Sequence, residues 1–194
     1  MEEKLIRATL EEMKTRSLKF TMDDLTRKLH VSKSSIYRIV SSKEELVRLV
    51  MEWAEERFNG KAEALLQEEG PVNRRLMALC GLFFETFWYL PDAANEDLEM
   101  RYEDIWKDWM RFREEKFDDM MALLKEGVDK GEYRQVNLPI VRQCVFSAAL
   151  GLTDPAFLKK MNMTSRDVLE VLEDIMMKGL EAKGLPDKKQ EGKS

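Results

Sequence analysis

The spacing of hydrophobic residues indicates helices along the whole chain. Apolar side chains recur three and four positions apart in long stretches that only five prolines and nine glycines interrupt. Nowhere do β-branched and aromatic residues alternate with polar ones over several positions, as they would in a half-buried strand. The pattern therefore predicts an all-α fold of about nine helices.

Capping residues and helix breakers set the expected boundaries. Thr21, Ser32 and Ser42 each stand before an apolar-periodic segment and carry the side-chain oxygen that an N-cap needs. Prolines 71 and 91 bound a further segment. The expected helices lie at about 2–14, 22–29, 33–40, 43–67, 72–90, 93–100, 101–128, 139–152 and 164–180.

The distribution of charge points to nucleic acid. The 194 residues carry 32 basic and 37 acidic side chains, a net charge of -5, so the chain has no overall positive charge that would attract DNA. Residues 14–43, however, hold eight basic and two acidic side chains, whereas residues 51–194 hold 21 basic and 29 acidic ones. A basic stretch of this kind (+6, beside a body of -8) over two short helices and a tight turn is typical of a helix-turn-helix DNA-binding module.

Three segments of this module resemble a known family. They read FTMDDL at 20–25, VSKSSIY at 31–37 and SKEEL at 42–46, and in order and spacing they are similar to the N-terminal signature of the TetR/AcrR transcriptional regulators. The resemblance implies an all-helical homodimer. Residues 1–50 would form its helix-turn-helix DNA-binding domain, residues 51–185 a ligand-binding and dimerisation domain, and residues 186–194 a disordered tail.

The resemblance also implies which residues contact a double-stranded DNA operator. By matched position, the recognition-helix residues are Lys33, Ser34, Ser35 and Tyr37, the phosphate contacts are Thr21, Ser32 and Lys43, and Arg38 is an additional contact. Lysine can reach guanine edges or phosphates, and hydroxyl groups can donate or accept hydrogen bonds. The alternative is that the Tyr37 side chain is partly buried in the core and that the lysines are exposed to solvent without contacting DNA.

Two turns depart from the family pattern. Ser17 and His30 stand where the family usually has glycine. A left-handed backbone at His30 is tolerated at a cost of about 1 kcal/mol. The module is therefore expected to fold, with packing that differs in detail from other members.

Aromatic residues and methionines in the larger domain suggest a binding cavity. A pocket with such a lining accepts a bulky apolar molecule with adaptable fit. We therefore predict a small apolar or amphipathic effector, with Glu85, Arg101 and Glu103 as candidate polar anchors or, alternatively, as residues of a solvated face. The predicted ligand-binding residues are Phe84, Phe87, Trp88, Arg101, Tyr102, Trp106, Trp109 and Met110. The alternative is that the aromatic residues simply fill the core between helices.

The last two predicted helices are candidates for a dimer interface. Small residues at 147–149 and 151 permit close approach of helices, and the apolar stripes are wide enough to pack against a second copy. Internal core is the competing interpretation.

Composition argues against several other classes of protein. Two cysteines and one histidine rule out a disulfide scaffold and argue against a zinc cage and a histidine-based triad, so we expect no catalytic residues, no metal and no cofactor. No membrane segment or signal peptide is apparent, which predicts a cytoplasmic protein. The sequence offers no paired nucleophile and base and no cofactor fingerprint, which predicts that the protein is not an enzyme.

Together the sequence predicts a ligand-responsive transcriptional regulator. It would be a repressor that a small effector releases from a near-palindromic operator. The alternative function is a small-molecule-binding helical protein with no role on DNA, against which the positive charge at 14–43 argues.

Overall fold

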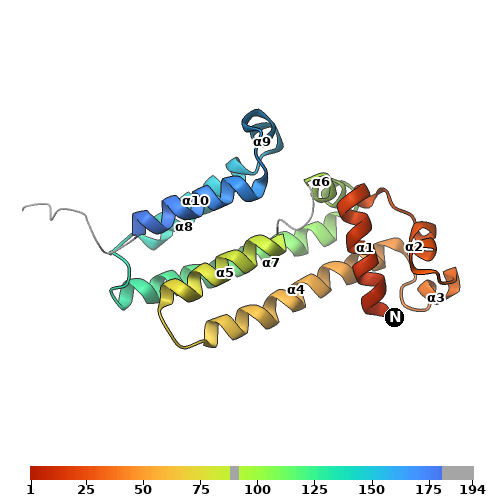
Figure 1. The fold of residues 1–194 in the computed structure, drawn as a ribbon, viewed down its shortest axis with the longest axis horizontal. Helices are drawn as coiled ribbons and strands as arrows, with labels where there is room; N and C mark the ends of the chain where they lie inside the picture. Colours follow the sequence, from red (N-terminus) through yellow and green to blue (C-terminus); the bar gives the residue numbers. More distant parts are fainter. Residues whose placement is uncertain (88–91, 181–194) are drawn as a thin grey trace, which may run out of the picture. The chain divides into compact units, whose positions relative to one another are not determined.

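The protein is built from helices, as the sequence predicts (Figure 1). The computed structural model describes residues 1–87 and 92–180, and this part of the chain contains no β-strand. Its elements are α1 (Glu2–Arg16), the 3-10 turn η1 (Ser17–Lys19), α2 (Met22–Leu29), α3 (Lys33–Tyr37), α4 (Lys43–Gln67), α5 (Val72–Phe87), α6 (Asp92–Arg101), α7 (Glu103–Asp129), α8 (Leu138–Leu152), α9 (Pro155–Met161) and α10 (Ser165–Leu180). The tail predicted at 186–194 lies outside the described residues.

The described residues form ten α-helices where about nine were expected, because α9 escapes the apolar pattern. Asp154 caps this helix by accepting a hydrogen bond from the backbone N–H of Phe157 at 2.9 Å, and Pro155 occupies its first turn. Asn162 ends it in a left-handed conformation. A helix of seven residues makes only two turns, which is too short for a periodicity to be recognised.

The chain divides into two compact units. The first comprises Met1–Glu69 and Arg75–Met120, and the second comprises Gly70–Arg74 and Met121–Ser194. None of the described helices combines the length and the apolar character that crossing a bilayer would require.

In the first unit, α1, α2, α3 and the start of α4 enclose a small core. Helix α1 packs against α2 and α4, and α2 packs against α3. The shared interior is formed by side chains that are almost completely buried, among them Leu5, Ile6, Met13, Leu18, Phe20, Leu25, Ile36, Leu46 and Val50. The helix-turn-helix therefore rests on an apolar base that includes the first two turns of α4.

All three predicted N-caps are confirmed. The hydroxyl oxygens of Thr21, Ser32 and Ser42 accept hydrogen bonds from backbone N–H groups at the starts of α2, α3 and α4. At α2 the pair is reciprocal, because the Asp24 carboxylate accepts from the Thr21 N–H at 2.8 Å. The hydrogen bonds from Thr21 lower the pKa of Asp24 to about 2.

A cluster of aromatic rings joins α4, α5 and α7, which run alongside one another in Figure 1. Phe58 of α4 contacts Phe87 of α5 and Phe112 of α7, each with ring centroids 5.7 Å apart. Trp109 lies 4.8 Å from Phe87. Because these rings are nearly fully buried, they form the core of the larger part of this unit.

The second unit is organised by α8 packing on α10 and by the turn after α7. The Glu132 carboxylate accepts hydrogen bonds from the first N–H groups of α5, at Val72 and Asn73. The Tyr133 ring packs so closely on Gly127 that any Cβ there would clash with it. Helix α7 thus continues through Gly127, and the turn itself uses Gly131, whose φ is 74°.

His30 and Ser17 both adopt positive φ angles, at 53° and 56°. His30→Gly should stabilise the protein by about 0.5–1 kcal/mol and raise Tm by roughly 1–4 °C, because glycine removes the left-handed penalty. Ser17→Gly also relieves its backbone but loses a hydroxyl group that binds Ala93 and Asp97, so its Tm should fall. Thermal unfolding of the two variants checks this contrast, and stabilisation by Ser17→Gly would contradict it.

Candidate nucleic-acid interface and effector pocket

Helix α3 presents most of the predicted DNA-contacting side chains to solvent. Tyr37 is 48% exposed, which is high for an aromatic residue and places its ring outside the core. Lys33, Ser34 and Arg38 are also exposed, while Ile36 is completely buried beneath them. One face of this short helix therefore anchors it, and the other is available for contact.

Hydroxyl groups gather at the start of the same helix. The Ser32 oxygen lies 2.8 Å from that of Ser34 and 2.9 Å from that of Ser35, and the Arg38 guanidinium donates to Ser35 at 3.3 Å. Ser32 and Thr21 are exposed, although their oxygens already serve as N-caps. Ser35 is half-buried, so its role in this cluster is partly structural.

Acidic neighbours reduce the positive charge that the sequence places at 14–43. Glu11 and Glu12 of α1 each form an ion pair with Lys28 at 2.9 Å. Counted with them, residues 11–43 hold eight basic and four acidic side chains, a net charge of +4. Asp24 pairs with Arg27 at 2.5 Å, and Asp23 pairs with Lys33 at 2.7 Å. The Lys33–Asp23 pair is mostly exposed on both sides, so it contributes little and can open for a phosphate.

Lys43 has a different position from the other predicted contacts. Its ammonium group donates to the carbonyl oxygens of Leu18 at 2.5 Å and Phe20 at 2.6 Å, and it lies 4.3 Å from the centroid of the Phe20 ring. Burial, together with the nearby Arg101 guanidinium, lowers the pKa of Lys43. To reach a phosphate, this ammonium group would have to leave both carbonyls.

Helix α6 contacts the segment 17–20 from the other side. The Ser17 hydroxyl lies 2.8 Å from the Ala93 carbonyl oxygen and also contacts the Asp97 carboxylate. That carboxylate accepts from the Leu18 N–H at 3.3 Å and from Arg101 at 3.2 Å. The hydrogen bond from Ser17 lowers the pKa of Asp97. We call residues 17–20 the corner, because η1, α4 and α6 all meet there.

The predicted ligand-binding residues occupy several environments. Phe87 and Trp109 are 4% exposed and belong to the aromatic cluster, and Phe84 contacts Phe83 with centroids 6.2 Å apart. Arg101 is exposed and bound to Asp97. Tyr102, Trp106 and Met110 are half-buried, and Trp88 lies outside the described residues.

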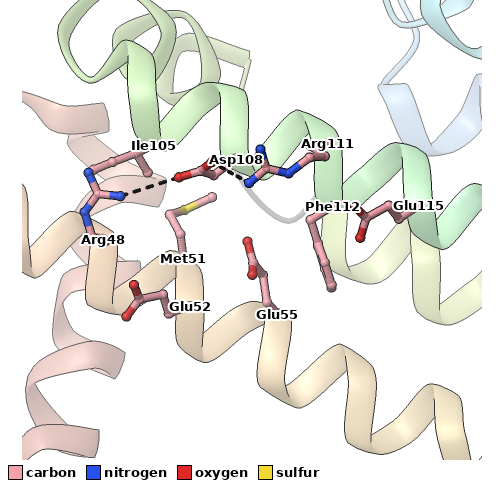
Figure 2. Close-up of a pocket in the computed structure, with 9 residues that line it drawn as sticks. All are labelled: Arg48, Met51, Glu52, Glu55, Ile105, Asp108, Arg111, Phe112 and Glu115. Atoms are coloured by element: carbon pink, nitrogen blue, oxygen red, sulfur yellow. Dashed lines mark hydrogen bonds and ion pairs between the residues drawn. The ribbon is translucent and has the colours of Figure 1, made fainter.

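A pocket of about 260 Å³ lies between α4 and α7 (Figure 2). It is lined by Arg48, Met51, Glu52, Glu55, Ile105, Asp108, Arg111, Phe112 and Glu115. In Figure 2 the Glu55 carboxylate points from α4 toward the space between Met51 and Phe112. None of the seven predicted ligand-binding residues that the structure describes lines this pocket, so the role of all eight in binding an effector stays a prediction.

Acidic side chains dominate the lining. Arg48 and Arg111 share one partner, Asp108, at 3.6 Å and 2.7 Å. Burial, reinforced by the carboxylates of Asp108 and Glu52, raises the pKa of Glu55 to about 7. The pocket thus holds a carboxyl group that is partly protonated near neutral pH.

Sequence reasoning missed this pocket. Its α4 residues recur at 48, 51, 52 and 55, and its α7 residues at 105, 108, 111, 112 and 115, which is ordinary helical spacing. A solvated helix face with charged residues shows the same spacing. Only the packing of α4 beside α7 distinguishes the two cases.

Fold and site define a class of protein, an all-helical protein with an N-terminal helix-turn-helix. Residues 5–50 match the model of the family of bacterial regulatory proteins described as the tetR family. Residues 5–50 are thus similar to the N-terminal domain of that family, and the chain shares its fold with solved TetR-family transcriptional regulators. A role as a DNA-binding regulator is the function that these similarities support.

Similar proteins span nearly the whole chain. The HTH-type transcriptional regulator YvaF of Bacillus subtilis is 24% identical over 183 residues, covering 94% of this chain and 96% of its own length. The TetR-family regulator PfmR of Thermus thermophilus superposes with a TM-score of 0.63 at 19% identity, covering 91% of this chain and 98% of its own. A Saccharomonospora viridis protein, solved in complex with choline, has a TM-score of 0.74 at 13% identity, covering 93% and 97%.

Lys33 and Lys43 should respond differently to removal of their charge. Lys43→Met leaves two carbonyls at the corner without their donor, so we expect a loss of about 1–2 kcal/mol and a fall of roughly 2–6 °C in Tm. Lys33→Met should leave Tm unchanged and reduce the salt slope of duplex DNA binding by about 0.9, the value of one phosphate contact. Thermal unfolding and fluorescence anisotropy at several salt concentrations measure both. A reduced salt slope with unchanged Tm for Lys43→Met would contradict the assignment.

Glu55 should make stability depend on pH. Its folded-state pKa of about 7 lies above the ordinary value of 4.5, so the folded protein binds a proton that the unfolded chain releases. The resulting stabilisation is complete below pH 4.5 and is lost as pH rises through 7. With solvent screening of this half-buried group, Glu55→Gln should gain about 1 kcal/mol at pH 8, or about 2–4 °C in Tm, and almost nothing at pH 5. Glu56→Gln, on the exposed side of α4, is the control, and an equal gain at both pH values would contradict the prediction.

Proposed function

We propose that this protein is a ligand-responsive repressor that binds a near-palindromic operator as a homodimer. In this proposal residues 1–50 bind DNA, and residues 51–185 bind the effector and form the dimer. The observation that carries it is the exposed face of α3. Tyr37, Lys33 and Ser34 are exposed there, while Ile36 of the same helix is fully buried.

The chemistry of that face suits the major groove. Lys33 can exchange the Asp23 carboxylate for a phosphate or a guanine edge, and Tyr37 can bring its phenol to the DNA backbone. Arg38 extends the same surface at the end of the helix. Thr21 and Ser32, whose side-chain oxygens cap helices, are exposed residues at the starts of α2 and α3, where a phosphate can be contacted.

The corner offers a route from effector to DNA. Lys43, the first residue of α4, donates hydrogen bonds to the carbonyl oxygens of Leu18 and Phe20. The Asp97 carboxylate of α6 accepts hydrogen bonds from the Ser17 hydroxyl and the Leu18 N–H. Helix α7 begins at Glu103, directly after α6 ends at Arg101. An effector that changes the spacing of α4 and α7 would therefore act on both attachments of the helix-turn-helix and shift its population between DNA-binding and released positions.

Dimerisation is assigned to α8 and α10. These two helices pack together and leave apolar side chains exposed, with Ile140 at 60%, Val171 at 52% and Ile175 at 61%. Such a face is typical of a surface that a second copy covers. A dimer would place two copies of α3 one helical turn of DNA apart, about 34 Å, as a near-palindromic operator requires.

Selection of bound sequences from random duplex DNA tests the proposal. The full-length protein should enrich a near-palindromic site, and fluorescence anisotropy should show two chains per site with an affinity that falls steeply with salt. Tyr37→Ala and Ser34→Ala should lower affinity for the selected site by more than tenfold with little effect on Tm. Binding of random DNA as tightly as any selected site would contradict the proposal.

The dimer is tested in the same assay. Ile175→Asp introduces a charge into the exposed apolar face of α10 and should convert the protein to a monomer in analytical ultracentrifugation. That variant should bind the selected site at least tenfold more weakly. Asp174→Asn, at the adjacent exposed position, is the matched control and should behave as the unaltered protein. A monomeric Ile175→Asp variant with full operator affinity would show that no dimer is needed.

A further inference from the structure

The pocket between α4 and α7 combines an apolar floor with a carboxyl group that has no counter-charge of its own. Met51, Ile105 and Phe112 are 8% exposed or less and form its apolar surface. The Glu55 carboxylate points into the space beside them, and within residues 1–87 and 92–180 it has no hydrogen-bonding or ion-pair partner (Figure 2). A half-buried, unpaired carboxylate in a cavity is a group that a ligand can satisfy.

The charges of the lining favour a positive ligand. Two guanidinium groups and four carboxylates line the pocket, a net charge of -2 when all are ionised. Both guanidinium groups are bound to Asp108, at the end of the pocket nearest Arg48 in Figure 2. Among the described residues, the carboxylates of Glu52, Glu55 and Glu115 have no such pairing. An anion would meet this excess negative charge, whereas a cation would relieve it.

The arrangement does not suit a metal ion. Within the part of the chain that the structure describes, no three carboxylate, histidine or cysteine side chains converge as metal ligands do. The acidic groups are instead distributed along α4 and α7, with apolar atoms between them. A cation with its charge on a bulky organic group matches this distribution, because its substituents can contact Met51 and Phe112 while the charge lies near Glu55.

We propose that the α4–α7 pocket binds a small organic ammonium ion with an apolar substituent. This inference rests on the function proposed above in giving the pocket the role of effector site. A volume of about 260 Å³ is near the lower end of ligand pockets, so the ligand is small. The ammonium group lies against the Glu55 carboxylate, and the apolar substituent covers Met51 and Phe112.

Binding of this cation should be linked to release of a proton. Glu55 faces Glu52 on its own helix and Asp108, Arg111 and Glu115 on α7. Because its pKa lies near 7, part of the population must lose the Glu55 proton before the ammonium ion is bound. Affinity for the cation should therefore rise severalfold between about pH 6 and pH 8.

Isothermal titration calorimetry on the full-length protein without DNA tests the site directly. The probe is benzyltrimethylammonium, compared with benzyl alcohol and benzoate, which carry similar rings and no positive charge. We expect one cation bound per chain, at least tenfold tighter than either comparison compound, with proton release at pH 7 seen as a dependence on buffer ionisation enthalpy. Equal binding of benzyl alcohol or benzoate would overturn the proposal.

Variants place the binding in this pocket. Glu55→Gln should weaken binding of the cation at least tenfold and abolish the proton release, while Glu56→Gln should leave both unchanged. Glu115→Gln, at the other end of the pocket, should weaken binding by a smaller factor and serves if Glu55→Gln fails to fold. Unchanged affinity in the folded Glu55→Gln or Glu115→Gln variant would overturn the assignment of the site.

A separate measurement distinguishes this inference from the proposed function. Benzyltrimethylammonium is added to the complex of the protein with its selected DNA site, and release is followed by anisotropy. Cation binding without DNA release would support the pocket and refute its role as effector site. Release of DNA by the cation in the Glu55→Gln variant, as in the unaltered protein, would refute the pocket while the regulatory function stands.

Discussion

One ammonium group ties the turn before the helix-turn-helix to the start of α4. The carbonyl oxygens of Leu18 and Phe20, in the turn at 17–20, both accept hydrogen bonds from the Lys43 side chain. Partial burial penalises this charge, which is why its pKa falls, and the two short hydrogen bonds and the Phe20 ring offset the penalty. Since Lys43 is also the first residue of α4, these hydrogen bonds tie the turn at 17–20 to the start of that long helix.

Asp97 completes the corner by contacting the opposite side of the same turn. Its carboxylate accepts from the Leu18 N–H, while the Leu18 carbonyl oxygen accepts from Lys43, so one peptide segment is held by α6 and α4 together. The positive φ angle at Ser17 is retained because its hydroxyl contacts Asp97 and Ala93. Glycine would relieve the backbone but could not make these contacts, which gives the departure from the family pattern a physical reason.

Helix positions and N-caps could be predicted from the sequence because both are local. The apolar spacing located all the long helices, and Thr21, Ser32 and Ser42 cap helices as expected. Properties that depend on which side chains meet in space could not be predicted. Glu11 and Glu12 lie outside the basic stretch in sequence yet neutralise Lys28, and Lys43 is turned inward by carbonyls that no motif identifies. The pocket is of the same kind, since its two halves come from separate helices, α4 and α7, that are far apart in the chain.

Glu55 is the residue whose presence local stability does not explain. Its carboxyl group is partly desolvated, is repelled by Glu52 and Asp108, and is relieved only weakly by Arg111, which Asp108 already binds. A neutral side chain of the same shape would avoid that cost. Proteins that keep such locally unfavourable groups tend to do so at binding sites, where a ligand supplies the missing interaction. The strain at Ser17 has its compensating contacts within the chain, whereas the described residues offer Glu55 none, and so a compensating charge from outside the chain is the simplest physical account of it.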